Sequence, residues 1–259
     1  MQFLKKLATQ LLPRPILMWG KKHYYAYVVP RFWEPEVEPI KFFIKPGDSA
    51  VDLGANIGWY TTVLSGLVGD HGKVFAVEPI AETFCLLSAV VKKLGLKNVE
   101  LFNCAVSDKD GSAVMEIPKH GYGGPNFYMA RIIAGQPAKP SHERVEVPLR
   151  SLDSLLPGGL AEAVTFVKCD VEGHELAVFK GAVKFFEKTK PAMMIEVTGT
   201  PEMQDAPNNE FHTIMKGYGY VPYWFDGKNL RKRLKGQWSV NYFFLQAAHL
   251  PQVAHLVAE

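Results

Sequence analysis

The chain has 259 residues, of which 47% are hydrophobic and 21% are charged. This length and composition suit one globular domain with a full sheet-and-helix core. The net charge of +3 is too small to indicate a nucleic-acid or an acidic partner. No stretch reaches the ~18 consecutive apolar residues that a transmembrane helix needs.

The three cysteines indicate free thiols in a reducing compartment. Cys85, Cys104 and Cys169 lie far apart, each in an apolar stretch, and none belongs to a C-x-x-C pair. A disulfide framework and a zinc cluster are therefore not expected. On this basis the sequence predicts a cytoplasmic protein.

Residues 1–45 are expected to form a helical and aromatic lead-in that packs on a main domain of residues 46–259. Apolar residues at helical spacing within 3–12 predict a short amphipathic helix. Packing on the domain or a partner is favoured over attachment to a membrane surface. The aromatic and proline residues of 20–46 predict a short strand or irregular segment, followed by a helix near 36–44.

The stretch from Val51 to Gly58, V-D-L-G-A-N-I-G, lies between an apolar run and a helical pattern. Strand, glycine turn and helix in this order bind adenosine-type cofactors in doubly wound α/β folds, with Gly54 turning the backbone and Gly58 packing the helix on the strand. A dinucleotide turn would read G-x-G-x-x-G, but here the middle glycine is missing and Asp52 would repel a phosphate. The turn therefore favours S-adenosylmethionine (SAM), whose amino and sulfonium groups are cationic. A turn without a ligand is the alternative.

The next two predicted strands end in residues suited to an adenosine ligand. The strand over 73–79 ends near Glu78, about 20 residues past the turn, where doubly wound folds place the carboxylate that accepts the ribose hydroxyls. The alternative for Glu78 is an exposed acid at a strand end. A third strand is expected over 98–106, so that the segment at Val106 could contact adenine.

Residues near 112–148 are expected to form an insertion that faces the substrate. A hairpin strand expected over 112–117 and an alternating strand over 144–148 flank a stretch rich in glycine and proline over 118–140. Connections of this length are often binding loops or lids, although a mobile loop without a function is the alternative. A short helix is predicted over 151–156.

A second informative motif follows the apolar strand predicted over 164–169. Lys168, Asp170, Glu172, His174 and Glu175 crowd the end of this strand, which is expected to lie beside the first strand. Burying charge is costly, so such a cluster indicates a functional site. The alternative is a helix N-terminus rich in acids for the helix dipole, which would explain Glu172 and Glu175 but not Asp170.

The C-terminal part predicts the remaining sheet. An apolar helix is expected over 176–186, and a strand over 191–197 ends near Glu196. A helix over 208–218 precedes a closing pair of strands over 220–225 and 241–246. The basic run between those strands, Lys228 to Lys235, is interpreted as a solvated hairpin loop in preference to a phosphate contact.

These motifs resemble the FkbM family of SAM-dependent methyltransferases over about residues 44–246. The matching pieces are Val51–Gly58, Val77–Pro79, Ala105–Ser107, Val167–Glu175 and Ile195–Val197. The resemblance implies a Rossmann-like class I methyltransferase fold, with a mostly parallel seven-stranded sheet whose last strand is antiparallel. It implies methyl transfer from SAM to a hydroxyl oxygen of a small molecule, such as a sugar or a polyketide-type natural product.

The resemblance also implies roles for single residues. In the cofactor site, Glu78 would hold the ribose, Val106 would face adenine, and the methionine part would contact Asp52, Gly54, Asn56 and Gly58. Asp170 would border the sulfonium and the acceptor. A base near the acceptor oxygen should help an alcohol to react, and the candidates are Asp170, Glu172 and His174. Asp170 with Glu196 could instead hold a divalent cation, and the sequence does not choose between the two.

Three other functions are compatible with parts of the sequence. A nicotinamide oxidoreductase would need the missing glycine. A nucleic-acid methyltransferase is supported only by the basic run, because the sequence lacks the Asn/Asp-Pro-Pro-Tyr/Phe motif of base methylation. A non-catalytic SAM-binding protein would need Asp52 and Glu78 but not the cluster around Asp170. The acceptor's identity and the oligomeric state stay open.

Overall fold

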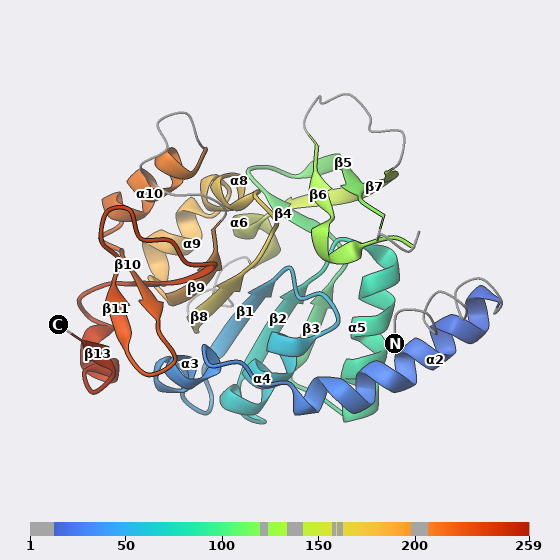
Figure 1. Cartoon of the computed structure of the whole chain (residues 1–259), viewed down its shortest axis with the longest axis horizontal. Helices are drawn as coiled ribbons and strands as arrows, with labels where there is room; N and C mark the ends of the chain where they lie inside the picture. Colours follow the sequence, from blue (N-terminus) through green and yellow to red (C-terminus); the bar gives the residue numbers. More distant parts are fainter. Residues whose placement is uncertain are drawn as a thin grey trace.

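The structure is a computed structural model that describes residues 13–119, 124–133, 142–156, 159, 163–197 and 207–258. Within these residues the chain forms a nine-stranded sheet with helices on both faces and a separate four-stranded sheet (Figure 1). The smaller sheet lies beyond the upper end of the strands in the view of Figure 1. The predicted α/β class is therefore confirmed.

The large sheet has the strand order β13-β11-β10-β12-β9-β8-β1-β2-β3. Its five central parallel strands are β1 (Ser49–Leu53), β2 (Lys73–Val77), β3 (Val99–Phe102), β8 (Val164–Cys169) and β9 (Ala192–Glu196). The closing strands are β10 (Val221–Phe225) and β12 (Asn241–Leu245), and β12 runs antiparallel to both β9 and β10. These seven strands confirm the expected doubly wound order with an antiparallel last strand.

Two short strands extend the sheet beyond the expected seven. β11 (Leu230–Lys232) pairs with β10, and β13 (Val257–Ala258) pairs with β11. The basic run at 228–235 is therefore not only a hairpin loop. Leu230 is buried against the core, while Arg231 and Lys232 stay exposed, so one apolar side chain brings part of the run into the sheet.

The central strands are buried on both faces, as their apolar sequences predict. In β1, Val51 packs against α8 (Glu175–Lys180), α9 (Val183–Lys188) and α10 (Pro207–Gly217) on one face. Ala50 belongs to the core on the other face. The helices of that other face are α3 (Val37–Phe43), α4 (Trp59–Val68) and α5 (Ala81–Leu94). Because β1 lies between β2 and β8 and runs parallel to both, the turn from β1 to α4 lies beside the carboxyl ends of these two strands.

The four-stranded sheet contains β4 (Ala105–Ser107), β7 (Glu143–Ser151), β5 (Gly111–Ile117) and β6 (Arg131–Ile132), in that order. The expected hairpin is confirmed, because β5 pairs antiparallel with residues 143–149 of β7 along its whole length. The single strand expected over 98–106 is wrong. β3 ends at Phe102, and the side-chain amide of Asn103 donates to the carbonyls of Glu78 and Pro79. This turn sends β4 to pair with β7 instead.

The N-terminal part differs from the prediction. A helix, α2 (Arg14–Val28), occupies most of the segment for which a strand or irregular chain was expected, and a 3-10 turn, η1 (Val29–Arg31), follows it. Pro13 is its N-cap and Pro15 lies in its first turn, where a missing N–H costs nothing, so these prolines start a helix rather than break one. The helix expected near 36–44 is confirmed as α3.

Other N-terminal predictions remain without a test. The amphipathic helix expected within residues 3–12 lies outside the described residues. The division into a lead-in and a domain at residue 45 stays a prediction. None of the described helices is both long enough and apolar enough to cross a membrane.

The helix expected over 176–186 is divided into α8 and α9 near Gly181. A Cβ atom at this glycine would lie 2.0 Å from the carbonyl oxygen of Ser107, so the backbone of α8 ends directly against β4. The short helix α6 (Leu152–Leu155) is confirmed and begins at Ser151, whose hydroxyl accepts from the Ser154 N–H. The last turn, η3 (Leu250–Val253), packs with α3.

Candidate active site

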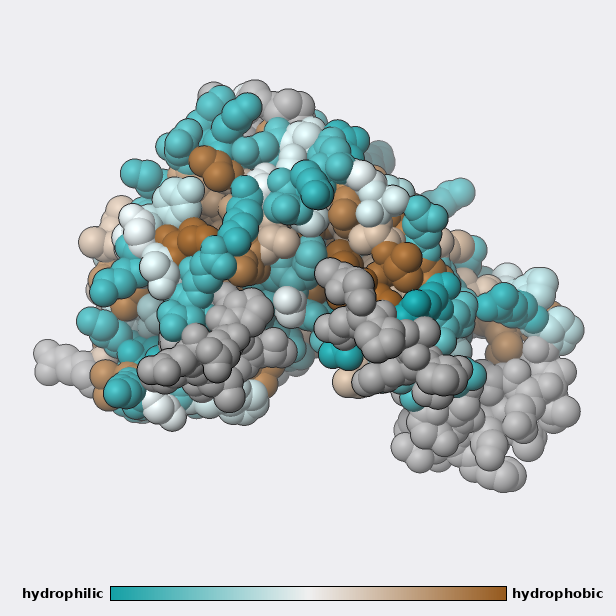
Figure 2. Space-filling model, turned by 90° about the horizontal axis from the view of Figure 1, so that it is seen from above, coloured by the Kyte–Doolittle hydropathy of each residue, from teal (hydrophilic) through white to brown (hydrophobic). Residues whose placement is uncertain are grey.

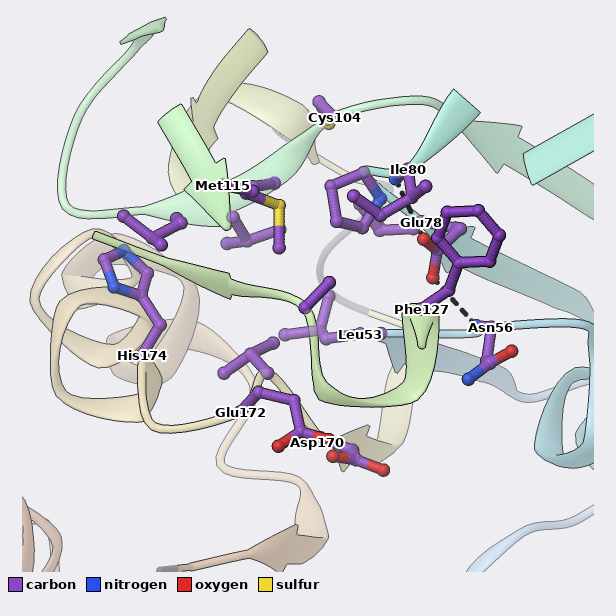
Figure 3. Close-up of a pocket in the computed structure, with 18 of the residues that line it drawn as sticks. Leu53, Asn56, Glu78, Ile80, Cys104, Met115, Phe127, Asp170, Glu172 and His174 are labelled. Atoms are coloured by element: carbon purple, nitrogen blue, oxygen red, sulfur yellow. Dashed lines mark hydrogen bonds between the residues drawn. The ribbon is translucent and has the colours of Figure 1, made fainter. Parts of the chain in front are cut away.

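A cavity of about 260 Å³ opens at the carboxyl ends of the parallel strands. Figure 2 views the molecule from this side and shows hydrophobic patches among hydrophilic side chains. The wall combines residues of β1, β2, β8 and β9 with residues of the four-stranded sheet (Figure 3). The predicted site residues on this wall are Gly54, Asn56, Glu78, Val106, Asp170, Glu172, His174 and Glu196.

The glycine turn after β1 lies against the backbone of the β8 end. Gly54 has φ = 76°, and a Cβ atom there would lie 1.8 Å from the carbonyl oxygen of Asp170. The N–H groups of Gly54 and Ala55 both donate to the carbonyl of Val77. Asn56 also has a left-handed backbone, with φ = 50°. The turn is thus fixed between two neighbouring strands and leaves open backbone toward the cavity.

Asp52 lies beneath this turn and does not line the cavity. It is 1% exposed, and the Thr61 hydroxyl donates to its Oδ2 at 2.6 Å. Burial raises the pKa of Asp52 to about 6, although the Thr61 hydrogen bond and the Lys168 charge oppose the shift. Its predicted contact with the methionine part stays a prediction.

Gly58 also lies outside the cavity wall. It has φ = 97° and forms the N-cap of α4. A Cβ atom there would lie 2.9 Å from Cδ1 of Leu87, on α5. Gly58 was expected to let the helix pack closely on the strand. Instead, it lets the start of α4 approach α5.

Glu78 is held with its carboxylate facing the cavity (Figure 3). The Asn56 N–H donates to Oε2 at 3.0 Å, and the Ile80 N–H donates to Oε1 at 2.9 Å. Burial outweighs these two hydrogen bonds and raises the pKa of Glu78 to about 7. A carboxylate fixed by backbone donors can still accept from ligand hydroxyls through its remaining lone pairs.

Val106 and its neighbours form an apolar wall next to Glu78. Ala105 packs with Ile80 and with Met115 of β5 in one buried cluster, and Val106 is 3% exposed. Phe127 and Tyr128 of the 3-10 turn η2 (Phe127–Met129) continue this wall. These two residues belong to the predicted insertion, so the described part of the insertion does reach the cavity.

Sequence reasoning missed Met115 and Ile132 as cavity residues. They lie on β5 and β6, within the segment expected to face the substrate, but neither residue was a named candidate. The sequence predicted a strand over 112–117 but none over 131–132, and it carried no signal for where the second sheet would pack. Sequence reasoning also missed Thr61, the hydrogen-bond partner of Asp52, which lies in the first turn of α4.

The carboxylates beyond the glycine turn form an acidic wall. Asp170, Glu172 and Glu196 all line the cavity, at the ends of β8 and β9. Lys168 is 3% exposed, and its Nζ lies 3.6 Å from Oδ2 of Asp170. Burial and the charges of Asp170 and Glu196 raise the pKa of Glu172 to about 7. Glu172 has φ = 53°, a left-handed conformation that is uncommon for a residue with a side chain.

His174 is not brought together with the other two base candidates. Its Nε2 lies 2.9 Å from the hydroxyl of Ser107 on β4, and Figure 3 shows its ring turned away from the Asp170 carboxylate. Burial lowers the pKa of His174. Glu175 has a structural role, because its Oε1 accepts a hydrogen bond from the Gly173 N–H at 3.0 Å, at the start of α8.

The cavity offers few ligands for the divalent cation that was the alternative to a base. Among the described residues, no group of three or more His, Cys, Asp or Glu side chains converges on a common metal position. Asp170 and Glu196 alone would leave most of the coordination shell to water. By contrast, the open backbone at Gly54, the fixed carboxylate of Glu78 and the apolar wall at Val106 fit the parts of SAM.

Residues 52–222 match the Methyltransferase FkbM domain. The chain belongs to the FkbM methyltransferase family. This match spans the glycine turn, Glu78, the segment at Val106 and the cluster at Asp170. The family that the motifs resembled, the FkbM family of SAM-dependent methyltransferases, is therefore confirmed.

Curated relatives match over shorter stretches. A protein-L-isoaspartate O-methyltransferase from Triticum aestivum is 28% identical over 123 residues, which is 48% of this chain and 48% of the relative. One from Methanocella arvoryzae is 32% identical over 59 residues, or 23% of this chain and 31% of the relative. The matched stretches thus span about half or less of these relatives.

A methyltransferase FkbM of known structure from Methylobacillus flagellatus is 16% identical. It superimposes with a TM-score of 0.48 over 76% of this chain and 43% of its own.

Proposed function

We propose that this FkbM methyltransferase transfers the methyl group of SAM to a neutral hydroxyl oxygen of a small molecule, such as a sugar or a polyketide-type natural product. The acidic wall of Asp170, Glu172 and Glu196 supports this proposal. Lys168 is the buried cation beside this wall among the described residues. Such a wall attracts the sulfonium of SAM and tolerates a neutral acceptor.

The same wall disfavours anionic acceptors. The named substrate of the wheat relative is a protein L-isoaspartate, which carries a carboxylate, and RNA carries phosphates. Either group would meet three carboxylates in a partly buried cavity, where like charges repel strongly. The proposal therefore excludes nucleic acid as a partner, and a protein carboxyl acceptor becomes an outcome that the experiment below can reveal.

The cofactor would lie across the whole cavity. Glu78 would accept from the ribose hydroxyls, the wall at Val106 would contact adenine, and the turn from Gly54 to Asn56 would border the methionine part. Asp52 and Gly58 would not contact SAM directly but would hold the turn that SAM contacts. When bound, SAM supplies an activated methyl carbon, so alignment of the acceptor oxygen contributes much of the catalysis.

Glu172 is the best placed of the three base candidates. It lines the cavity, and its pKa of about 7 suits a group that must accept a proton near neutral pH. The Asp170 carboxylate lies 3.6 Å from the Lys168 Nζ and borders the cavity, which suits a positioning role next to the sulfonium. The His174 imidazole is engaged with Ser107 at another part of the wall. We therefore assign Glu172 as the base.

The proposal includes a cytoplasmic location, and two other functions are its alternatives. The described cysteines are unpaired thiols, in keeping with the predicted cytoplasmic location. A nicotinamide oxidoreductase and a non-catalytic SAM-binding protein are the alternatives that binding and turnover would reveal.

The first experiment is calorimetric titration of the purified protein with SAM, S-adenosylhomocysteine and NAD. Binding of the first two and none of NAD supports the proposed cofactor site. Binding of NAD alone would overturn the proposal. With SAM binding established, sugar and natural-product hydroxyls, an isoaspartyl peptide and RNA are compared as methyl acceptors.

Variants then separate catalysis from cofactor binding. For Glu172→Gln we expect kcat to fall by about 10²- to 10⁴-fold, the usual contribution of a general base, with SAM affinity unchanged. Asp170→Asn should also reduce turnover, whereas Glu146→Gln, at an exposed position on β7, should not. An unchanged kcat in Glu172→Gln would remove Glu172 from the mechanism. Methylation of the isoaspartyl peptide alone would replace the hydroxyl acceptor.

A further inference from the structure

The helix α2 carries a row of large hydrophobic side chains that face solvent. Ile16, Trp19 and Tyr27 are 52%, 65% and 62% exposed, and Trp33 shortly after the helix is 66% exposed. Ile16, Trp19, His23 and Tyr27 follow one another at intervals of three or four residues and so share one face of the helix. We call these four residues the α2 outer face.

The opposite side of α2 is already occupied. Met18 and Tyr25 pack against the cluster that contains Leu86 and Val90 of α5. The Lys21 Nζ lies 3.0 Å from Oε1 of Glu82 on the same helix. Figure 1 shows α2 lying along the outside of α5, at the end of the sheet formed by β3. The outer face is therefore presented by a helix that is fixed to the domain.

The charged residues of the segment that carries this face are all basic, and two of them, Arg14 and Lys21, face Glu82 of α5. Residues 14–33 contain four Lys or Arg residues and no Asp or Glu. Beside α2, a shallow groove against α5 is lined by Lys22, Lys92 and Lys93, together with Cys85, Ser88 and Ala89. At the end of the helix, the guanidinium of Arg31 lies 3.8 Å from the ring centre of Tyr27. The aromatic row is thus bordered by cations.

We infer that the α2 outer face docks on the surface of a membrane that contains anionic phospholipids. Trp and Tyr rings are the side chains that favour the boundary between acyl chains and headgroups. Lys and Arg next to them attract anionic headgroups, so the two features together are typical of an interfacial helix. Lys22, Lys92 and Lys93 would border the lipid phosphates, while Trp19 and Tyr27 would enter the boundary region.

The charge pattern argues against a second copy of the chain as the occupant. A two-fold symmetric contact through this face would place the same patch against itself. Because the segment lacks acidic residues, the contact would bring like charges together. A membrane with negative lipids supplies the missing opposite charge.

The inner side of α2, opposite the docking face, contacts the wall of the methyltransfer cavity. The Tyr25 hydroxyl on the inner side of α2 shares a hydrogen bond with Tyr128. Tyr128 is also part of the cavity wall. The docking itself does not depend on which acceptor the enzyme uses, so it is tested by binding alone.

The test is co-sedimentation of the full chain with vesicles of phosphatidylcholine alone and with vesicles that also contain phosphatidylglycerol. We expect binding to the anionic vesicles that weakens with added salt. The double variant Trp19→Ser/Tyr27→Ser should lose it. Lys22→Gln combined with Lys92→Gln should weaken it by about tenfold or more, given the contribution of each cation near an anionic surface.

The matched control removes equally exposed hydrophobic residues elsewhere. Leu234 and Trp238 are 62% and 63% exposed, and they follow β11 near the opposite edge of the sheet. Leu234→Ser/Trp238→Ser should bind vesicles like the wild type, and SAM titration checks that both double variants are folded. The inference is overturned if the wild type ignores anionic vesicles, or if both double variants bind equally. It is also overturned if light scattering shows a dimer that only Trp19→Ser/Tyr27→Ser dissociates, since the face would then join two copies.

Discussion

At the scale of single residues, Glu78 shows how position turns a common carboxylate into a binding group. The N–H groups of Asn56 and Ile80 fix its two oxygens. Only 6% of the residue is exposed, and burial raises its pKa to about 7 despite both hydrogen bonds. Such a group charges readily only when a ligand supplies hydroxyl donors or a positive charge.

The first prediction concerns this carboxylate. Glu78→Gln should weaken SAM binding by about 10- to 100-fold, because a hydrogen bond to a charged group contributes about 1.5–3 kcal/mol. Calorimetric titration measures the change. Glu100→Gln is the control, since Glu100 is exposed on β3 and lies outside the cavity wall. Equal SAM affinity in wild type and Glu78→Gln would remove Glu78 from the cofactor site.

At the scale of elements, the glycine turn joins two strands into one site. Gly54 follows β1, and its Cα faces the carbonyl oxygen of Asp170 at the end of β8. The Asp170 N–H in turn donates to the carbonyl of Leu53 at 3.0 Å. The cofactor turn and the acidic wall are therefore held in a fixed relation by backbone alone, which a side chain at residue 54 would disturb.

Gly54→Ala should destabilise the fold by about 2–4 kcal/mol, the range typical of a backbone clash combined with strain at positive φ. Gly219→Ala is the matched control, because Gly219 has φ = 81° but nothing within 4 Å of the added Cβ. It should cost only about 1 kcal/mol, the strain of the backbone conformation alone. Urea unfolding of both variants gives the comparison. Similar losses in the two would show that the contact with Asp170 does not matter.

At the scale of the whole molecule, the charge of the surface and that of the cavity have opposite signs. The chain has a net charge of +3, yet Asp170, Glu172 and Glu196 meet at one end of the sheet. Burial raises the pKa values of Asp52, Glu78 and Glu172 to about 6, 7 and 7. Without a cationic ligand, the fold therefore holds protons that the unfolded chain would release.

This distribution predicts how stability depends on pH. The pKa of Glu78 is about 7 in the folded state, above its ordinary value of 4.5. Protonation of Glu78 therefore stabilises the folded state at pH values below about 7. The benefit is lost as pH rises through about 7. Between about pH 5 and pH 8, the wild type without SAM should lose on the order of 2 kcal/mol more unfolding free energy than Glu78→Gln.

The cationic cofactor should reverse this trend. SAM favours the charged carboxylates, so its binding should release protons and its affinity should increase as pH rises through about 7. Thermal unfolding with and without SAM across this range measures both effects. A SAM affinity that does not change with pH would contradict the raised pKa values of Glu78 and Glu172.

Much of the cofactor edge could be predicted because it depends on local order along the chain. An apolar strand followed by Gly54 predicts a turn, and an acid one strand later predicts Glu78 at the same edge. The prolines were harder to interpret, because Pro13 and Pro15 are equally suited to starting a helix and to interrupting one. The split near Gly181 could not be predicted, since it depends on the backbone of Ser107, which is distant in sequence.

The sequence by itself determined the doubly wound sheet, the cofactor and the family, because strand, turn and helix patterns repeat within short stretches. Only the tertiary structure decided that Asp52 lies under the turn and that His174 contacts Ser107 instead of Asp170. It also decided that β5 and β6 bring Met115 and Ile132 to the cavity. These contacts join residues far apart in the chain, and their geometry depends on how the second sheet packs on the first.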